Sequence, residues 1–250
     1  MGREFELRKD VELDATPEQV WAAIATGPGI ESWFMGPYEI EPREGGAMRM
    51  TVHGDVDEST ITAWEPPTRL CVRGTEAEDG TFHAFEYIVE GREGGSTVLR
   101  FVHSGFIGGD WGDEYVAQTG HGWDMYLHTL GEYLAHFTGR AGTFVYAEGP
   151  RTADGSRAWP RVAEALGVPE SVPRGERVLL APEGLPPIKG IADYTVPGHP
   201  DFLGVRTDSA LYRFHGHGDT VVVGHHLFAD GVDRAAEDDA WKGWLARVLG

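Results

Sequence analysis

Cysteine is nearly absent from this sequence, since Cys71 is the only one among 250 residues. A chain with one cysteine cannot form an internal disulfide, which fits a reducing compartment. Cys71 lies in the stretch TRLCVRGT, which reads as a strand, so we expect a structural thiol there. The cysteine content therefore favours a cytoplasmic protein.

Long apolar runs and an excess of positive charge are also missing. No apolar run approaches the roughly 20 residues that span a bilayer, and the opening stretch MGREFELRKD has no apolar core of signal-peptide length. The chain holds 21 Lys and Arg against 40 Asp and Glu, a net charge of −19. A field of that sign repels phosphate groups. We therefore expect a solvated acidic surface and neither a nucleic-acid nor a membrane partner.

Signatures of catalysis and cofactor binding are lacking as well. The sequence has no Gly-x-Ser-x-Gly motif, no phosphate-binding loop and no dinucleotide fingerprint. Two histidine groups are present, but their members are too far apart to share one ion. His121 and His128 would lie about 10 Å apart along a helix, and His215 would lie about 17 Å from His225 and His226 along a hairpin. We predict no metal, no cofactor and no catalytic residue.

Alternating apolar and polar residues dominate the first half of the chain. Phe5, Leu7, Val11 and Leu13 alternate with charged residues, a strand pattern that only Lys9 interrupts. A helix follows, for which Thr16, Pro17 and Gln19 supply the capping signals. A second short helix is expected over 30–34. Further strands are expected over 48–52, 61–64, 70–74, 85–89 and 97–103, before a long helix in the stretch GHGWDMYLHTLGEYLAHF, Gly120–Phe137.

The second half repeats this order in miniature. A strand is expected over 143–147 and a helix over 154–166, despite Pro160. Strands over 177–180, 188–196, 210–214 and 220–227 follow, and a helix over 234–249 closes the chain. Gly243-Trp244 in that helix matches Gly122-Trp123 in the earlier one. We predict two α+β domains, residues 1–140 and a diverged, shortened copy over 141–250.

Six motifs of the first half, in their order, carry a family resemblance. They are ATPEQVWAAI (Ala15–Ile24), ESWF (Glu31–Phe34), EGGAM (Glu44–Met48), ITAWEPPTRL (Ile61–Leu70), GGSTVLRFVHSGF (Gly94–Phe106) and the Gly-Trp of HGWDMYLHTLGEYL. Residues 5–138 resemble the heat shock protein 90 ATPase activator homologue family of the START-like, helix-grip superfamily. The resemblance implies a curved antiparallel sheet around a long C-terminal helix, with an apolar cavity between them. It implies no single activity, because fold alone does not determine function.

The expected cavity defines the candidate ligand-binding residues. On the long helix, Trp123 and Leu127 lie on the apolar stripe that should face the sheet. His103 is the clearest polar group that could orient a ligand. An open pocket and a filled core are equally compatible with the pattern. The predicted ligand-binding residues are Trp33, Phe34, Met48, Met50, Trp64, Phe85, Tyr87, Phe101, His103, Trp123 and Leu127.

The predicted function is binding of an apolar or amphipathic small molecule in this cavity, without catalysis. One alternative is a cochaperone-like interaction module, which the family name suggests and which would have a chaperone partner. Another is a cyclase, dehydratase or hydrolase acting in the cavity, which would need two or more polar groups around His103. The sequence leaves the ligand, the oligomeric state and the role of residues 141–250 open.

Overall fold

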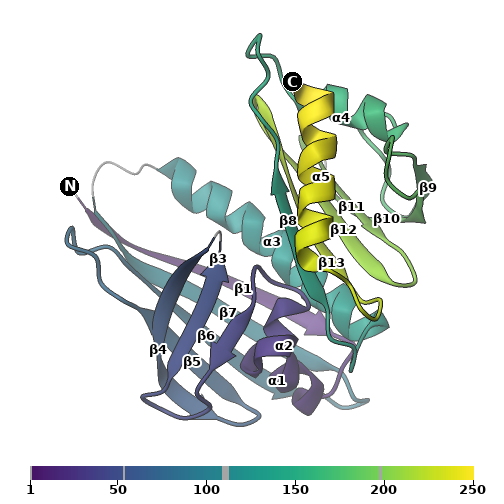
Figure 1. Ribbon diagram of the computed structural model, residues 1–250. Coiled ribbons are helices and arrows are strands. Elements are labelled where there is room, and N and C mark those ends of the chain that lie inside the picture. The colour runs from purple at the N-terminus through teal and green to yellow at the C-terminus, as the bar shows by residue number, and fades with distance from the viewer. Residues whose placement is uncertain (1, 53, 109–112, 197–198) are drawn as a thin grey trace. The chain divides into compact units, whose positions relative to one another are not determined.

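The computed structural model describes residues 2–52, 54–108, 113–196 and 199–250. Contacts between residues divide the chain into two compact units, Met1–Ala141 and Gly142–Gly250. Each unit consists of an antiparallel sheet and helices, which Figure 1 shows coloured along the chain.

The first unit contains a seven-stranded antiparallel sheet in the order β1-β7-β6-β5-β4-β3-β2. After β1, the chain forms two short helices, runs through β2 to β7 as a meander, and ends with a long helix. The strands are β1 (Arg3–Leu13), β2 (Tyr38–Ile40), β3 (Ala47–Val52), β4 (Asp55–Glu65), β5 (Arg69–Gly74), β6 (Phe82–Gly91) and β7 (Thr97–Ile107). The helices are α1 (Pro17–Ala25), α2 (Gly27–Glu31) and α3 (Asp113–His136).

Local side-chain chemistry explains where the first two helices begin. The Thr16 side chain accepts a hydrogen bond from the Gln19 backbone, and the Gln19 side chain accepts one from the Thr16 backbone. The predicted capping box of α1 is therefore confirmed. Helix α2 begins earlier than the predicted 30–34, because Thr26 caps it by accepting from the Gly29 backbone at 3.1 Å.

Helix α3 lies against β1 and α1. The residues of its predicted apolar stripe within the described part of the helix are buried, namely Trp123, Leu127, Leu130 and Leu134. Lys9, which interrupts the alternation in β1, pairs its ammonium group with the Asp124 carboxylate of α3. A charge at this position is therefore compensated where the strand meets the helix.

The second unit repeats the topology of the first with six strands in the order β8-β13-β12-β11-β10-β9. In both units the first strand pairs with the last, and a helix closes the chain. The strands are β8 (Thr143–Glu148), β9 (Arg177–Leu180), β10 (Ile188–Val196), β11 (His199–Arg206), β12 (Ala210–His217) and β13 (Thr220–Leu227), and the helices are α4 (Trp159–Leu166) and α5 (Arg234–Leu249). The predicted fold class, a helix-grip unit followed by a shortened copy, is confirmed.

The prediction for the second unit needs two corrections. Helix α4 begins at Trp159 rather than at 154, which places Pro160 in the first turn. The helix does not need to kink at Pro160. Proline lacks the backbone N–H, and an N–H in the first turn has no partner within the helix in any case. Strand β11 was not predicted. Gly204 lies within it and weakens the alternation of apolar and polar residues.

A buried ion pair joins two strands of the second sheet. Arg213 on β12 donates to both carboxylate oxygens of Asp193 on β10, at 3.1 and 2.7 Å. The two side chains are only 2% and 3% exposed. Burial of two charges is tolerated here because the guanidinium group and the carboxylate form a two-point hydrogen-bonded pair.

Candidate functional site

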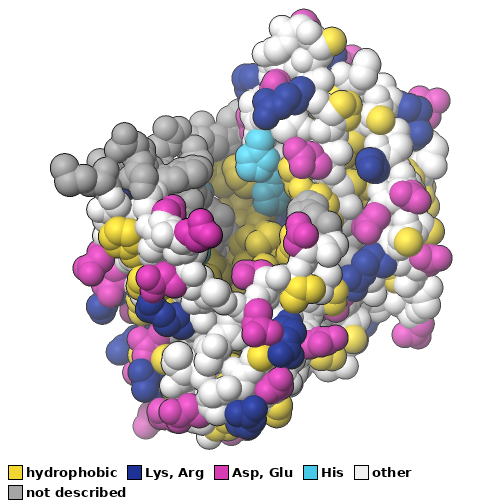
Figure 2. Space-filling view, turned by 60° about the vertical axis from the view of Figure 1, so that its left-hand side comes forward, with side chains coloured by type: hydrophobic (Ala, Val, Ile, Leu, Met, Phe, Trp, Pro, Cys, Tyr) yellow, Lys and Arg dark blue, Asp and Glu magenta, His cyan; other side chains and the backbone are white. Residues whose placement is uncertain are grey.

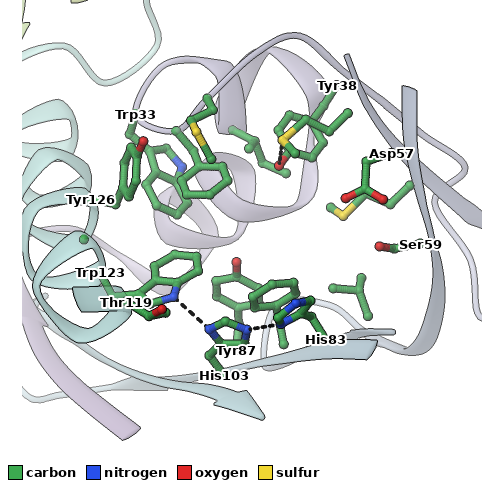
Figure 3. A pocket seen from close by; sticks show the side chains of 18 residues that line it. Trp33, Tyr38, Asp57, Ser59, His83, Tyr87, His103, Thr119, Trp123 and Tyr126 are labelled. Carbon is green, nitrogen blue, oxygen red and sulfur yellow. Dashed lines mark hydrogen bonds between the residues drawn. The ribbon is translucent and has the colours of Figure 1, made fainter. Parts of the chain in front are cut away.

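A cavity of about 360 Å³ lies in the first unit. Figure 3 shows the side chains around it, which come from α2, the segment after α2, the six strands β2 to β7 and α3. The lining residues are Ile30, Trp33, Phe34, Met35, Tyr38, Met48, Met50, Asp57, Ser59, Val72, His83, Phe85, Tyr87, His103, Thr119, Gly122, Trp123 and Tyr126.

Aromatic rings from two separate segments form one wall of the cavity. Phe34 stacks on Trp123 of α3 with ring centroids 5.2 Å apart and planes 3° apart, and it meets Tyr126 edge-on at 4.5 Å. Trp33 is 1% exposed and is fixed by a hydrogen bond from its indole nitrogen to the Ala23 carbonyl at 2.9 Å. This wall is therefore held in place by packing rather than by a mobile loop.

Strands β6 and β7 form the floor. Phe85 pairs with His103 in the strand register, and their rings stack at 4.5 Å. Tyr87 is two residues further along β6, so it lies on the same face. Figure 3 shows its hydroxyl directed into the cavity. Alternation along the two strands thus brings aromatic and imidazole groups to one surface.

A chain of hydrogen bonds joins this floor to α3. The Trp123 indole Nε1 donates to His103 Nδ1 at 3.0 Å. The other nitrogen of His103, Nε2, lies 3.0 Å from Nδ1 of His83 on β6. Both bonds are drawn as dashed lines in Figure 3. Both ring nitrogens of His103 are therefore engaged by other side chains.

His103, His83 and Tyr87 are held neutral near pH 7 by burial. Burial, with a smaller contribution from the neighbouring His83, lowers the pKa of His103 to about 3. Burial also lowers the pKa of His83, although the Asp57 carboxylate opposes this effect. The pKa of Tyr87 is raised by burial, so its phenol stays protonated. Among the described lining residues, only Asp57 has a carboxylate side chain.

Eight of the eleven predicted site residues line the cavity: Trp33, Phe34, Met48, Met50, Phe85, Tyr87, His103 and Trp123. Their role in ligand binding stays a prediction. Trp64 pairs with Leu70, which pairs with Tyr87, so it lies on the cavity side of the sheet. It is not part of the lining, however, and packs edge-on against Trp21 of α1 at 5.1 Å. Phe101 is fully buried against Trp123, with centroids 4.1 Å apart, and Leu127 is buried outside the lining.

Several polar lining residues were missed in the sequence, among them His83, Asp57 and Ser59. His83 shares the alternation of Phe85 and Tyr87, so extending that pattern by one step would have found it. Asp57 and Ser59 lie in the polar first half of β4, where the predicted strand had not yet begun. Figure 3 shows His83, Asp57 and Ser59 together on one side of the cavity.

Acidic side chains are dispersed over the surface. Figure 2 shows Asp and Glu residues intermixed with Lys and Arg on one face of the molecule. Some form exposed pairs, such as Arg49 with Glu58 at 2.6 Å and Arg69 with Glu86 at 2.8 Å. In the described parts of the chain, none of the helices has the length and apolar character needed to cross a membrane.

An antiparallel sheet that holds a long C-terminal helix over a cavity defines a helix-grip protein. Residues 14–135 match the model of the family described as activator of Hsp90 ATPase homolog 1-like protein. The first unit of the chain therefore belongs to this family, as the motifs in its sequence predicted.

Several solved structures are similar to the chain. MLL2253 from Mesorhizobium loti matches 53% of this chain and 98% of its own, at 20% identity and a TM-score of 0.47. Aha1 from Colwellia psychrerythraea, solved as a dimer, matches 52% of this chain and 96% of its own, at 19% identity and a TM-score of 0.44. BexL, a di-domain ARO/CYC protein of the BE-7585A biosynthetic pathway, matches 98% of this chain and 98% of its own, at 14% identity and a TM-score of 0.47. Likeness at this level adds no argument about activity. No curated protein sequence matches the chain.

Proposed function

We propose that the first unit binds an apolar or amphipathic small molecule in its cavity, without catalysis. The observation that carries this proposal is the cavity itself, about 360 Å³ in volume and lined mainly by aromatic and methionine side chains. Pockets for small molecules commonly have volumes of roughly 300–1,000 Å³ and an apolar lining with a few polar groups. Methionine side chains suit ligands of irregular shape because they change conformation easily.

The hydrogen bonds of His103 count against a catalytic role for that residue. A general acid or base must exchange a proton with the substrate through a free ring nitrogen. In His103, Nδ1 is hydrogen-bonded to Trp123 and Nε2 is hydrogen-bonded to His83. The low pKa of His103, about 3, also keeps it neutral near pH 7, so it lacks the imidazolium proton that a general acid would transfer. A cyclase, dehydratase or hydrolase that relies on His103 is therefore disfavoured.

A substitution that fills the cavity tests the proposal. Ser59 lines the cavity from β4, whereas its neighbour Thr60 is exposed on the other face of the strand. Fluorescence titration with N-phenyl-1-naphthylamine, a neutral apolar probe, measures the affinity. Native mass spectrometry of the purified chain would in addition detect a ligand that co-purifies.

Ser59→Trp should weaken probe binding by about tenfold or more, a loss of ~1.4 kcal/mol or more, and Thr60→Trp should leave it unchanged. Far-ultraviolet circular dichroism checks that both variants fold. Equal affinity of the Ser59→Trp variant and the wild type, or no saturable binding to the wild type, would refute the proposal.

The family description supports a second candidate, a cochaperone-like module that stimulates the ATPase of a bacterial Hsp90-type chaperone. Such a module would act through its surface, so its effect should survive filling of the cavity. The ATPase rate of the chaperone with wild type and with Ser59→Trp separates the two candidates. Stimulation by both proteins favours the cochaperone, and stimulation by neither removes it.

A further inference from the structure

The hydrogen-bond chain from Trp123 to His83 has a defined direction. An indole nitrogen can only donate, so His103 Nδ1, 3.0 Å away, must be the acceptor. A neutral imidazole carries one proton, and that proton must then be on His103 Nε2. The first hydrogen bond thus fixes the tautomer of His103.

The same reasoning extends to the second imidazole. His103 Nε2–H lies 3.0 Å from His83 Nδ1 and donates to it. His83 Nδ1 is then an acceptor, and the proton of neutral His83 is on Nε2. Burial supports this assignment, because it lowers the pKa of both histidines and so favours their neutral forms.

His83 lines the cavity, and in the described part of the chain its Nε2 donates to no protein group. We propose that Trp123 and His103 are positioning residues that hold His83 as a fixed hydrogen-bond donor, and that the cavity selects an uncharged aromatic compound with a carbonyl-type acceptor. This inference rests on the proposed binding function. It adds the ligand class and the residues that determine it.

Each part of that ligand class has its own structural reason. A ligand without an acceptor would bury the His83 N–H unpaired, which costs free energy. A carboxylate would meet the Asp57 carboxylate on the same side of the cavity, as Figure 3 shows. A flat aromatic body suits the wall made by Phe34 and Trp123, whose rings stack 5.2 Å apart.

The tautomers can be measured without any ligand. Nitrogen-15 NMR of the full chain distinguishes protonated from unprotonated imidazole nitrogens. We expect both histidines of the wild type to carry their proton wholly on Nε2, with Nδ1 unprotonated. A proton on Nδ1 of either residue, or signals averaged between the two tautomers, would overturn the direction of the chain and with it the proposal.

Ligand selectivity is tested with two probes of nearly the same shape. 2-Acetylnaphthalene has a carbonyl acceptor, and 2-isopropenylnaphthalene replaces that carbonyl with a methylene group. The ratio of their two dissociation constants cancels the general apolar contribution. We expect His83→Phe to reduce the preference for the ketone by about fivefold or more, and Trp123→Phe to reduce it in the same direction. His121→Phe, an exposed position on α3, is the matched control and should leave it unchanged.

The outcomes separate this inference from the function on which it rests. Binding of both probes with the same ratio in wild type and His83→Phe overturns the inference and leaves the binding function standing. Failure of both probes to bind the wild type overturns the binding function and the ligand class together. A fall in preference with His121→Phe as large as with His83→Phe would also refute the role of His83.

Discussion

Acid should destabilise the first unit through His103, and the replacement His103→Gln should remove this sensitivity. Glutamine does not titrate, and its amide keeps both a donor and an acceptor at this position. His103 is 4% exposed and its pKa falls from 6.5 to about 3 on folding. Between these values the unfolded chain binds a proton that the folded chain does not. The stability that this residue provides is therefore complete above pH 6.5 and is lost as the pH falls.

The magnitude follows from proton linkage. Each pH unit inside this window costs about 1.4 kcal/mol for one group. Between pH 6.5 and about pH 5, the wild type should therefore lose about 2 kcal/mol more unfolding free energy than His103→Gln. His83 is present in both proteins, so its own titration largely cancels in the comparison.

Hydrogen exchange measured by mass spectrometry suits this comparison, because peptides from β6 and β7 report on the first unit alone. The two proteins are compared at each pH, so the intrinsic pH dependence of exchange cancels. Protection in the wild type should fall more steeply toward acid than in the variant. Parallel curves between pH 6.5 and pH 5 would refute the assignment of a low pKa to His103.

Two further predictions concern Asp193 in the second unit and Cys71 in the first. Asp193→Asn leaves the Arg213 guanidinium buried without its counter-charge, so the second unit should lose about 3–5 kcal/mol, whereas the double variant Asp193→Leu/Arg213→Met should lose much less. Thermal unfolding measures both, and an unchanged transition in Asp193→Asn contradicts the reasoning. Burial, helped by Glu86, raises the pKa of Cys71 to about 11, so few thiolates exist at about pH 8. The folded chain should react slowly with a disulfide reagent and the unfolded chain fast, and rapid labelling of the folded chain would argue against this pKa.

Features controlled by neighbouring residues were predictable from the sequence. The capping box of α1 needs only Thr16 and Gln19, and the apolar stripe of α3 needs only the helical repeat. The alternation in β6 and β7 likewise placed Phe85, Tyr87 and His103 on the cavity side. Each of these patterns lies within one element, where spacing along the chain determines which face a side chain occupies.

Features that depend on distant residues were not predictable. Trp64 packs against Trp21 of α1 instead of lining the cavity, and the local pattern of β4 gives no sign of this contact. Strand β11 was missed because it contains Gly204, where a Cβ atom would lie 2.7 Å from Tyr194 and 2.9 Å from the Arg213 guanidinium group. The bond between His103 and Trp123 joins a strand to a helix, and no spacing rule connects them.

The pairing of the first strand with the last constrains how each unit folds during synthesis. Arg3 pairs with Ile107 in the first sheet, and Thr143 pairs with Leu227 in the second. Strand β1 therefore waits without its partner until β7 has been made, and this long separation slows folding. All of β1 to α3 precedes β8 in the chain, so the first unit is synthesised before the second. We expect the two sheets to be completed one after the other, with little opportunity for strands of one sheet to pair with strands of the other.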